Sequence, residues 1–342
     1  MKISTYLRRT ISVAVLGGAA LCVGAPASAA IIYNTGVAGT ATVAMGINDE
    51  GHLNTAVGNI VANSSTTGLA FKFADGSWRD ATSPGCFCEG WGVSVNNDTS
   101  GYANVDSDDG VNNLSLVGAP AATPSTFTTT TSITSLPGLT VRHAYAPADN
   151  APEALFKVVV TIRNKTGAAV NDVNYVRVMD WDVPPTEFAE YVTIRGTATT
   201  TLLERSHNDG FETANPLIDG APITAATLNA DFEDLGVFDH GAYFRFNFGT
   251  LEDLTEYTFT IFYGAAPSER TANLAMLAED IELYSLGQSS GAGGAASGVP
   301  ATFIFGFQGV GGVVVVPTPE PGSLALLGLG LMGLGFARRR RG

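Results

Sequence analysis

The sequence predicts an all-β protein, a predominantly antiparallel β-sandwich with one short amphipathic helix near its C-terminal end. An N-terminal signal peptide and a C-terminal transmembrane helix are expected to flank it. Two observations predict this class. Apolar and polar residues alternate at a period of two in many short segments, which Gly, Asn, Asp and Pro turns separate. The connections are also too short for the crossover helices that a parallel sheet needs.

The N-terminus has the layout of a secretory signal peptide. Three basic residues among the first nine precede an apolar run over residues 11–24, and an Ala-Ser-Ala cleavage site ends at Ala29. The run is shorter than the roughly 20 apolar residues of a spanning helix. We therefore expect signal peptidase to cut after Ala29 or Ala30, and we take residues 1–29 as the signal peptide.

The strands are predicted from the alternation of side chains. In residues 156–163, apolar side chains share one face and polar ones the other, as in a half-buried strand. This segment is expected to form a hairpin with residues 174–183, and residues 243–248 should pair with 257–263. Further strands are expected at residues 71–73, 91–95, 125–133, 139–145 and 303–307.

Residues 268–286 break the two-residue rule, because their apolar residues recur near helical spacing. This pattern predicts a short amphipathic helix that ends at Gly287, followed by a flexible loop over residues 288–298. The apolar residues of the expected helix are Leu274, Leu277, Ile281 and Tyr284.

Residues 30–312 are expected to form the body as one extended sandwich, with a break near residues 119–124 as the best position for a division into two domains. Residues 31–316 contain 11 basic and 31 acidic side chains, a formal charge of −20. Such acidity argues against nucleic acid and anionic membrane surfaces as partners. It is compatible with divalent cations or with simple solubility outside the cell.

The most conspicuous polar cluster lies at residues 179–191, where Asp180 and Asp182 would leave a strand on the same face. Paired carboxylates can serve a glycosidase, with Trp181 stacking on a sugar, but carboxylates that point in parallel do not flank a bond from two directions. No catalytic residue is therefore assigned. Calcium bound by oxygen ligands is the second interpretation and an Asp-capped turn the third. The candidate calcium ligands are Asp180, Asp182, Glu187 and Glu190.

A second acidic segment offers alternating oxygen ligands at Asp106, Asp108 and Asp109. The following Gly110 falls one place late for an EF-hand loop, and no glutamate follows at the required spacing. A different calcium loop and an exposed acidic turn remain the alternatives.

Cys86 and Cys88 are the two cysteines of the body, separated by one residue. A disulfide between them would close a small strained loop, and bonding to another molecule is the alternative. The four histidines occur singly and form no metal-binding or nucleophile motif, so they do not nominate an enzyme. They are His52, His143, His207 and His240.

Residues 313–322 form a Pro-rich linker, and an uncharged stretch at residues 323–337 is expected to enter the membrane as a helix. A basic tail at residues 338–342 would hold that end in the cytoplasm, which leaves the body outside. The residues that define this C-terminal layout are Pro319, Glu320, Pro321, Arg338, Arg339, Arg340 and Arg341.

This layout resembles the PEP-CTERM sorting signal. The resemblance implies that an exosortase, an integral membrane enzyme, cuts near the Pro-Glu-Pro and releases or transfers the protein, so residues 323–337 would be a sorting helix. It also implies a Gram-negative host that makes extracellular polysaccharide. The protein would be anchored in the inner membrane transiently, and then located at the cell surface or in the extracellular matrix. Residues 179–191 of the body also resemble a stretch of uncharacterised secreted proteins.

We therefore expect an exported, non-enzymatic structural or adhesion protein of the surface or of a biofilm matrix. The alternatives are a carbohydrate-binding module that uses Trp78, Trp91 or Trp181, and a secreted hydrolase acting on polysaccharide. Signal peptidase and exosortase are the expected partners during maturation, and extracellular polysaccharide is the candidate partner afterwards. No cofactor is expected, with calcium as the one candidate.

Overall fold

The computed structural model describes residues 29–106 and 110–315. The predictions for the signal peptide up to residue 28, for Asp108 and Asp109, and for the sorting motif, helix and basic tail lie outside these described residues. Within the described part of the chain, no helix combines the length and the apolar character needed to cross a bilayer.

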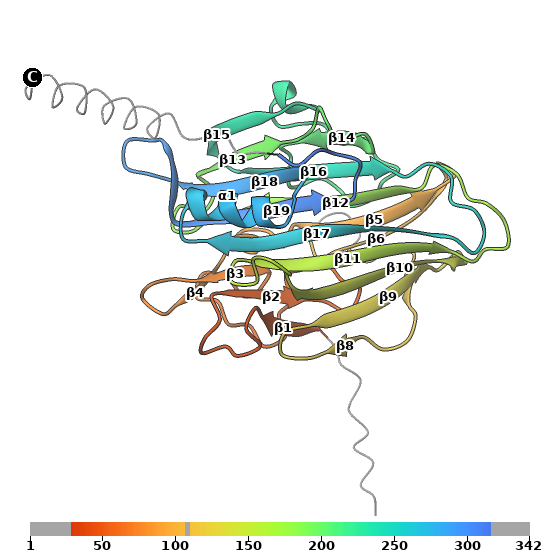
Figure 1. Cartoon of the computed structure of the whole chain (residues 1–342), viewed down its shortest axis with the longest axis horizontal. Coiled ribbons are helices and arrows are strands. Elements are labelled where there is room, and N and C mark those ends of the chain that lie inside the picture. The colour runs from red at the N-terminus through yellow and green to blue at the C-terminus, as the bar shows by residue number, and fades with distance from the viewer. Residues whose placement is uncertain (1–28, 107–109, 316–342) are drawn as a thin grey trace, which may run out of the picture.

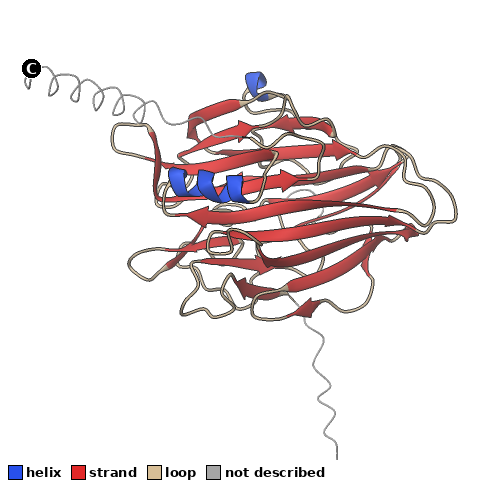
Figure 2. Cartoon of the chain, in the orientation of Figure 1, coloured by secondary structure: helices blue, strands red, loops and turns tan. Residues whose placement is uncertain are grey.

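The described strands form three sheets (Figures 1 and 2). The first contains, in order, β1 (Ala30–Tyr33), β2 (Val43–Ile47), β3 (Leu69–Lys72) and β4 (Trp78–Asp80). The five-stranded sheet has the order β14 (Leu203–His207), β16 (His240–Asn247), β12 (Asn174–Trp181), β5 (Glu89–Val95) and β6 (Thr99–Asn104).

The third sheet has ten strands. Its order is β15 (Phe232–Phe238), β13 (Glu190–Arg195), β18 (Leu283–Ser290), β19 (Ala296–Gln308), β17 (Glu256–Ala266), β11 (Leu155–Asn164), β10 (Leu136–Pro147), β9 (Phe127–Ile133) and β7 (Leu114–Leu116), and β8 (Ala121–Ala122) also pairs with β9. Every strand pair among the described residues is antiparallel. Strands account for 48% of the described residues and helices for 5%, which confirms the predicted all-β class.

One apolar core joins the ten-stranded sheet to the two smaller sheets. A single fully buried cluster contains residues of all three sheets. They include Val158 and Phe303 of the large sheet, Trp91 and Phe244 of the five-stranded sheet, and Leu69 of the four-stranded sheet. Since successive side chains of a strand point to opposite faces, the two-residue alternation places this apolar set inside a sandwich. The cluster draws residues from both sides of positions 119–124. The predicted body boundaries at residues 30 and 312 stay predictions.

The helix α1 (Glu269–Ala278) covers the outer face of the large sheet, over β17 and β19 (Figure 1). Its Ala272, Ala275 and Met276 pack against apolar residues of that face, which include Phe262 and Ile304. The Oγ of its N-cap Ser268 accepts a hydrogen bond from the Thr271 amide at 3.3 Å.

The helix is shorter than predicted. Asp280 adopts a left-handed φ of 53°, which ends the helix, and the chain then enters β18. Ile281 and Tyr284 are therefore buried beyond the helix, whereas Leu274 and Leu277 are exposed on its outer face. Gly287 lies within β18 and does not end the helix. The predicted loop over residues 288–298 is also corrected, because β18 continues to Ser290 and β19 begins at Ala296.

The predicted strands exist, but both predicted strand pairings are wrong. β11 pairs with β10 and β17 in the ten-stranded sheet, whereas β12 pairs with β5 and β16 in the five-stranded sheet. β16 and β17 are divided between the same two sheets. Each connection crosses between the sheets, so the two successive strands belong to different sheets instead of lying side by side. The alternation of apolar and polar side chains is the same whether two successive strands pair in one sheet or lie in different sheets. The sequence pattern could therefore not distinguish these arrangements.

Candidate metal centre

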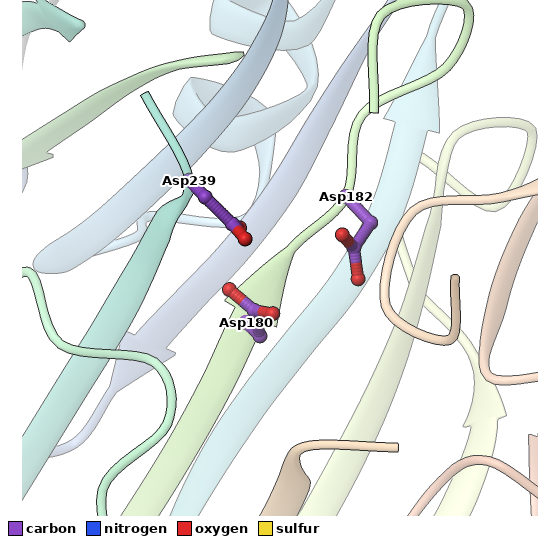
Figure 3. A group of neighbouring side chains, drawn as sticks. All are labelled: Asp180, Asp182 and Asp239. Carbon is purple, nitrogen blue, oxygen red and sulfur yellow. The ribbon is translucent and has the colours of Figure 1, made fainter. Parts of the chain in front are cut away.

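Three aspartates meet at the end of β12. Asp180 is the second-to-last residue of that strand, Asp182 follows it, and Asp239 is the single residue between β15 and β16. Their carboxylate oxygens lie within 4.8 Å of one another. Figure 3 shows Asp180 and Asp239 facing each other with Asp182 beside them. The pairing of β12 with β16, in which Trp181 lies opposite His240, brings Asp239 to this strand end.

The chain crosses between the two sheets twice at this point. After β12 it leaves the five-stranded sheet and reaches the ten-stranded sheet at Glu190 of β13. After β15 it makes the opposite crossing within the single residue Asp239. The backbone amide of His240 donates a hydrogen bond to Glu190 Oε1 at 3.1 Å, which links the two crossings.

The cluster is buried, and its acidic groups crowd one another. Asp180 is 1% exposed and Asp182 is 0% exposed, whereas Asp239 is half-buried. Burial raises the pKa of Asp180 well above its usual value, and the nearby Asp239 carboxyl raises it further. Burial also raises the pKa of Asp182, together with the Asp180, Asp239 and Glu190 carboxyls, and it raises the pKa of Glu190 to about 9.

Of the predicted calcium ligands, the structure brings Asp180 and Asp182 together and places Glu190 next to them. Glu187 is used elsewhere, since its Oε1 accepts a hydrogen bond from Asn63 Nδ2 at 2.9 Å. Asp239 is not among the predicted ligands, because it is far from Asp180 along the chain. An all-oxygen set of this kind suits a hard divalent cation.

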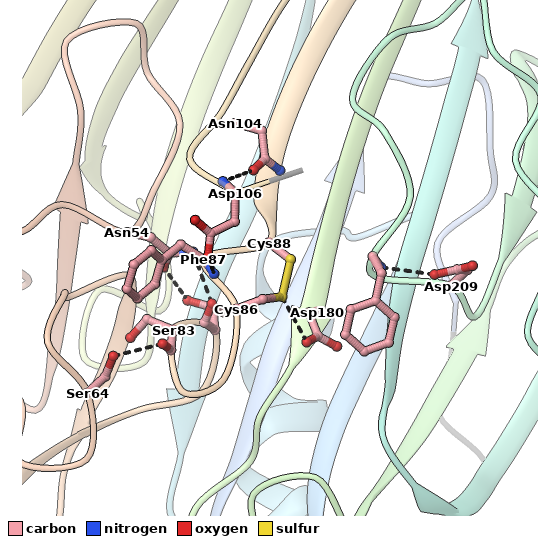
Figure 4. Close-up of a disulfide and its surroundings, with 12 residues drawn as sticks. Asn54, Ser64, Ser83, Cys86, Phe87, Cys88, Asn104, Asp106, Asp180 and Asp209 are labelled. Carbon is pink, nitrogen blue, oxygen red and sulfur yellow. Dashed lines mark hydrogen bonds between the residues drawn. A yellow bond between two sulfur atoms is a disulfide. The ribbon is translucent and has the colours of Figure 1, made fainter. Parts of the chain in front are cut away.

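The disulfide between Cys86 and Cys88 lies beside this cluster (Figure 4). Its Cys86 Sγ is 3.5 Å from Asp180 Oδ2. The Phe87 amide donates a hydrogen bond to Asp106 Oδ2 at 2.8 Å, so this exposed carboxylate caps the backbone of the cysteine loop. Disulfide-bonded sulfurs carry no thiolate and leave the metal chemistry to oxygen.

The predicted sugar platform at Trp181 is wrong, because this indole is fully buried and donates a hydrogen bond from Nε1 to Ser285 Oγ at 2.9 Å. Trp91 is also fully buried, and Trp78 is half-buried with its ring centroid 6.0 Å from that of Tyr33. All four histidines are buried as well: His52, His143, His207 and His240.

The fold and this site define an all-β sandwich with an acidic cluster at the crossings between its sheets. Residues 317–341 match the PEP-CTERM protein-sorting motif. The chain therefore carries a PEP-CTERM sorting motif, which indicates export, membrane anchoring for sorting and processing by an exosortase. No curated protein matches the chain. No solved structure matches it either.

Proposed function

We propose that this protein is a non-enzymatic structural or adhesion component of the cell surface or of an extracellular polysaccharide matrix. The observation that carries the proposal is the sorting motif at residues 317–341, attached to a sandwich with a sealed core. Sorting delivers the body outside the cell, and a rigid β-sandwich suits a protein that must persist there.

The burial of the groups that could perform acid–base chemistry supports a non-enzymatic role. Asp180 and Asp182 are enclosed, and each of the four histidines is at most 4% exposed. A general acid or base must come within about 3 Å of the proton that it transfers. The protein that encloses these side chains keeps a polysaccharide from approaching them so closely. The enclosed Trp91 and Trp181 likewise offer no open face to a sugar ring.

The first experiment changes Pro319, Glu320 and Pro321 together to alanine in the native host, with Thr318→Ala as the matched control. We expect the triple variant to stay in the membrane fraction at its unprocessed mass, and the control to behave as wild type. The biofilm should weaken in the triple variant as it does in a strain lacking the protein. A normal biofilm in the deletion strain would refute the matrix role while leaving the sorting result intact.

A second assay separates the proposal from a hydrolase. The purified protein is incubated with the extracellular polysaccharide of its host, and new reducing ends are measured alongside co-sedimentation. Co-sedimentation without new reducing ends supports the proposal. Turnover that disappears in Asp180→Asn would overturn it.

A further inference from the structure

We propose that Asp180, Asp182 and Asp239 bind a calcium ion, and that this ion fastens the two crossings between the sheets. The inference does not depend on the matrix role. It starts from the placement of the three carboxyl groups, whose oxygens lie within 4.8 Å of one another although they come from two separate crossings.

Several buried oxygens of this cluster have no hydrogen-bond partner among the described residues. Asp182 is 0% exposed, and neither of its carboxylate oxygens has a hydrogen-bond partner among the described residues. Three more buried oxygens of the cluster also lack a hydrogen-bond partner among the described residues: Asp180 Oδ1, Asp239 Oδ1 and Glu190 Oε2. Native proteins rarely bury polar atoms in this way, so several such oxygens in one place indicate a ligand that satisfies them.

Another buried carboxylate of the same protein, that of Glu89, is fully compensated. Glu89 Oε1 accepts hydrogen bonds from Arg177 Nε at 2.5 Å and from Tyr263 Oη at 2.8 Å, and Glu89 Oε2 accepts one from the Leu53 amide at 2.7 Å. No lysine or arginine among the described residues forms an ion pair with the aspartate cluster. The cluster therefore lacks the positive charge that compensates the buried Glu89 carboxylate.

The ligand chemistry selects the ion. Three carboxylates favour a hard dication, and the adjacent sulfurs are tied in a disulfide, which removes the thiolates that zinc prefers. Calcium–oxygen bonds of about 2.3–2.6 Å let one ion join oxygens up to about 5 Å apart, which accommodates the observed separations. Magnesium requires shorter bonds and a more rigid octahedron. The half-buried Asp239 provides a side from which the ion and its remaining water ligands can enter.

The test uses the full-length chain, purified in detergent and stripped of metal with EDTA. Adding about 10 mM CaCl2 should raise the Tm by about 3–10 °C, since a ligand that binds only the folded state stabilises it. Terbium, used as a calcium substitute, should luminesce on excitation of tryptophan. Trp181 is the residue between Asp180 and Asp182 in the sequence, so it is close enough to transfer energy to a bound terbium ion. Calcium should quench this signal by competition.

The variants Asp182→Asn and Asp239→Asn should each weaken calcium binding by about tenfold or more. In EDTA they should be at least as stable as wild type, because each replaces one carboxyl group of a crowded acidic cluster with a neutral amide. Asp98→Asn, in the exposed turn between β5 and β6, is the matched control and should keep the full response. If the buried Asp182 variant fails to fold, the half-buried Asp239→Asn variant still tests calcium binding.

Three outcomes would overturn the proposal. The first is a wild-type Tm that does not respond to calcium, and the second is an equal response in Asp239→Asn. An equal rise with MgCl2 would overturn the assignment to calcium.

Discussion

Arg177 of β12 donates a hydrogen bond from Nε to Glu89 of the neighbouring strand β5 at 2.5 Å, and both side chains are 0% exposed. The Tyr263 hydroxyl reaches the same Glu89 oxygen from the opposite sheet at 2.8 Å. The pair therefore joins the two layers of the sandwich through the middle of the core.

Glu89→Gln should destabilise the protein by about 3 kcal/mol, because it leaves the buried Arg177 guanidinium without a countercharge. Urea unfolding at neutral pH measures the loss. Glu256→Gln removes the partner of Arg163 in an exposed pair and is the control, with an expected change below about 1 kcal/mol. A double change, Glu89→Leu with Arg177→Met, should recover much of the stability. Equal losses in Glu89→Gln and Glu256→Gln would contradict this account.

The buried His52 should make the fold sensitive to acid. Burial lowers its pKa to about 3, with a further contribution from Arg177, and His143 and Glu50 also face it. The unfolded chain thus binds more protons between about pH 3 and 6.5, so this contribution to stability is complete above pH 6.5 and is lost as the pH falls toward 3.

His52→Gln should remove that contribution. Between pH 7.5 and 4.5, we expect the unfolding free energy of the variant to fall by about 2 kcal/mol less than that of wild type. Urea titrations at the two pH values give the comparison, and each protein serves as its own reference at pH 7.5. Parallel losses in both proteins would exclude His52 as a source of the acid sensitivity.

Gly287 should resist substitution. A β-carbon at this position would lie 2.6 Å from Cδ2 of Trp181, in the centre of the sandwich. Gly287→Ala is therefore expected to cost about 1–3 kcal/mol through overpacking. Gly39→Ala is the control, since a β-carbon there meets no atom within 4 Å. Thermal unfolding distinguishes them, and a Gly287→Ala protein as stable as the control would show that the indole moves freely.

The two faces of α1 should differ in their contributions. Met276 is 2% exposed and packs on the sheet, so Met276→Ala should cost about 2–4 kcal/mol. Leu274 is 58% exposed, and Leu274→Ala should have little effect on stability. Chemical denaturation of the two variants tests which face of α1 packs on the sheet. The reverse order of effects would instead favour the predicted helix face that contains Leu274.

The strands could be predicted because alternation is a local property that survives in any antiparallel arrangement. Partners could not be predicted, since nothing near β11 or β12 indicates that the connection between them crosses to another sheet. The helix was predicted too long for a related reason. Ile281 and Tyr284 continue a helical spacing by coincidence, while their burial comes from the strand that follows.

The candidate site was predicted in the same partial way. Asp180 and Asp182 were identified because they are neighbours in sequence, and Asp239 was missed because only the pairing of β12 with β16 brings it near. Spacing suggested Glu187 as a ligand, but its side chain turns to Asn63. A single strand register thus decides which carboxylates meet.

The position of β19 sets the order of events during export. It is the final strand of the described chain, yet it lies between β17 and β18 in the interior of the largest sheet. A chain that has emerged only as far as β18 leaves each of these strands with a partner on one side and an open hydrogen-bonding edge on the other. The sorting motif begins only a few residues after β19. The tail consequently reaches the membrane as the sheet becomes complete. The first anchored form of the protein is therefore also the first in which β19 can pair with both β17 and β18.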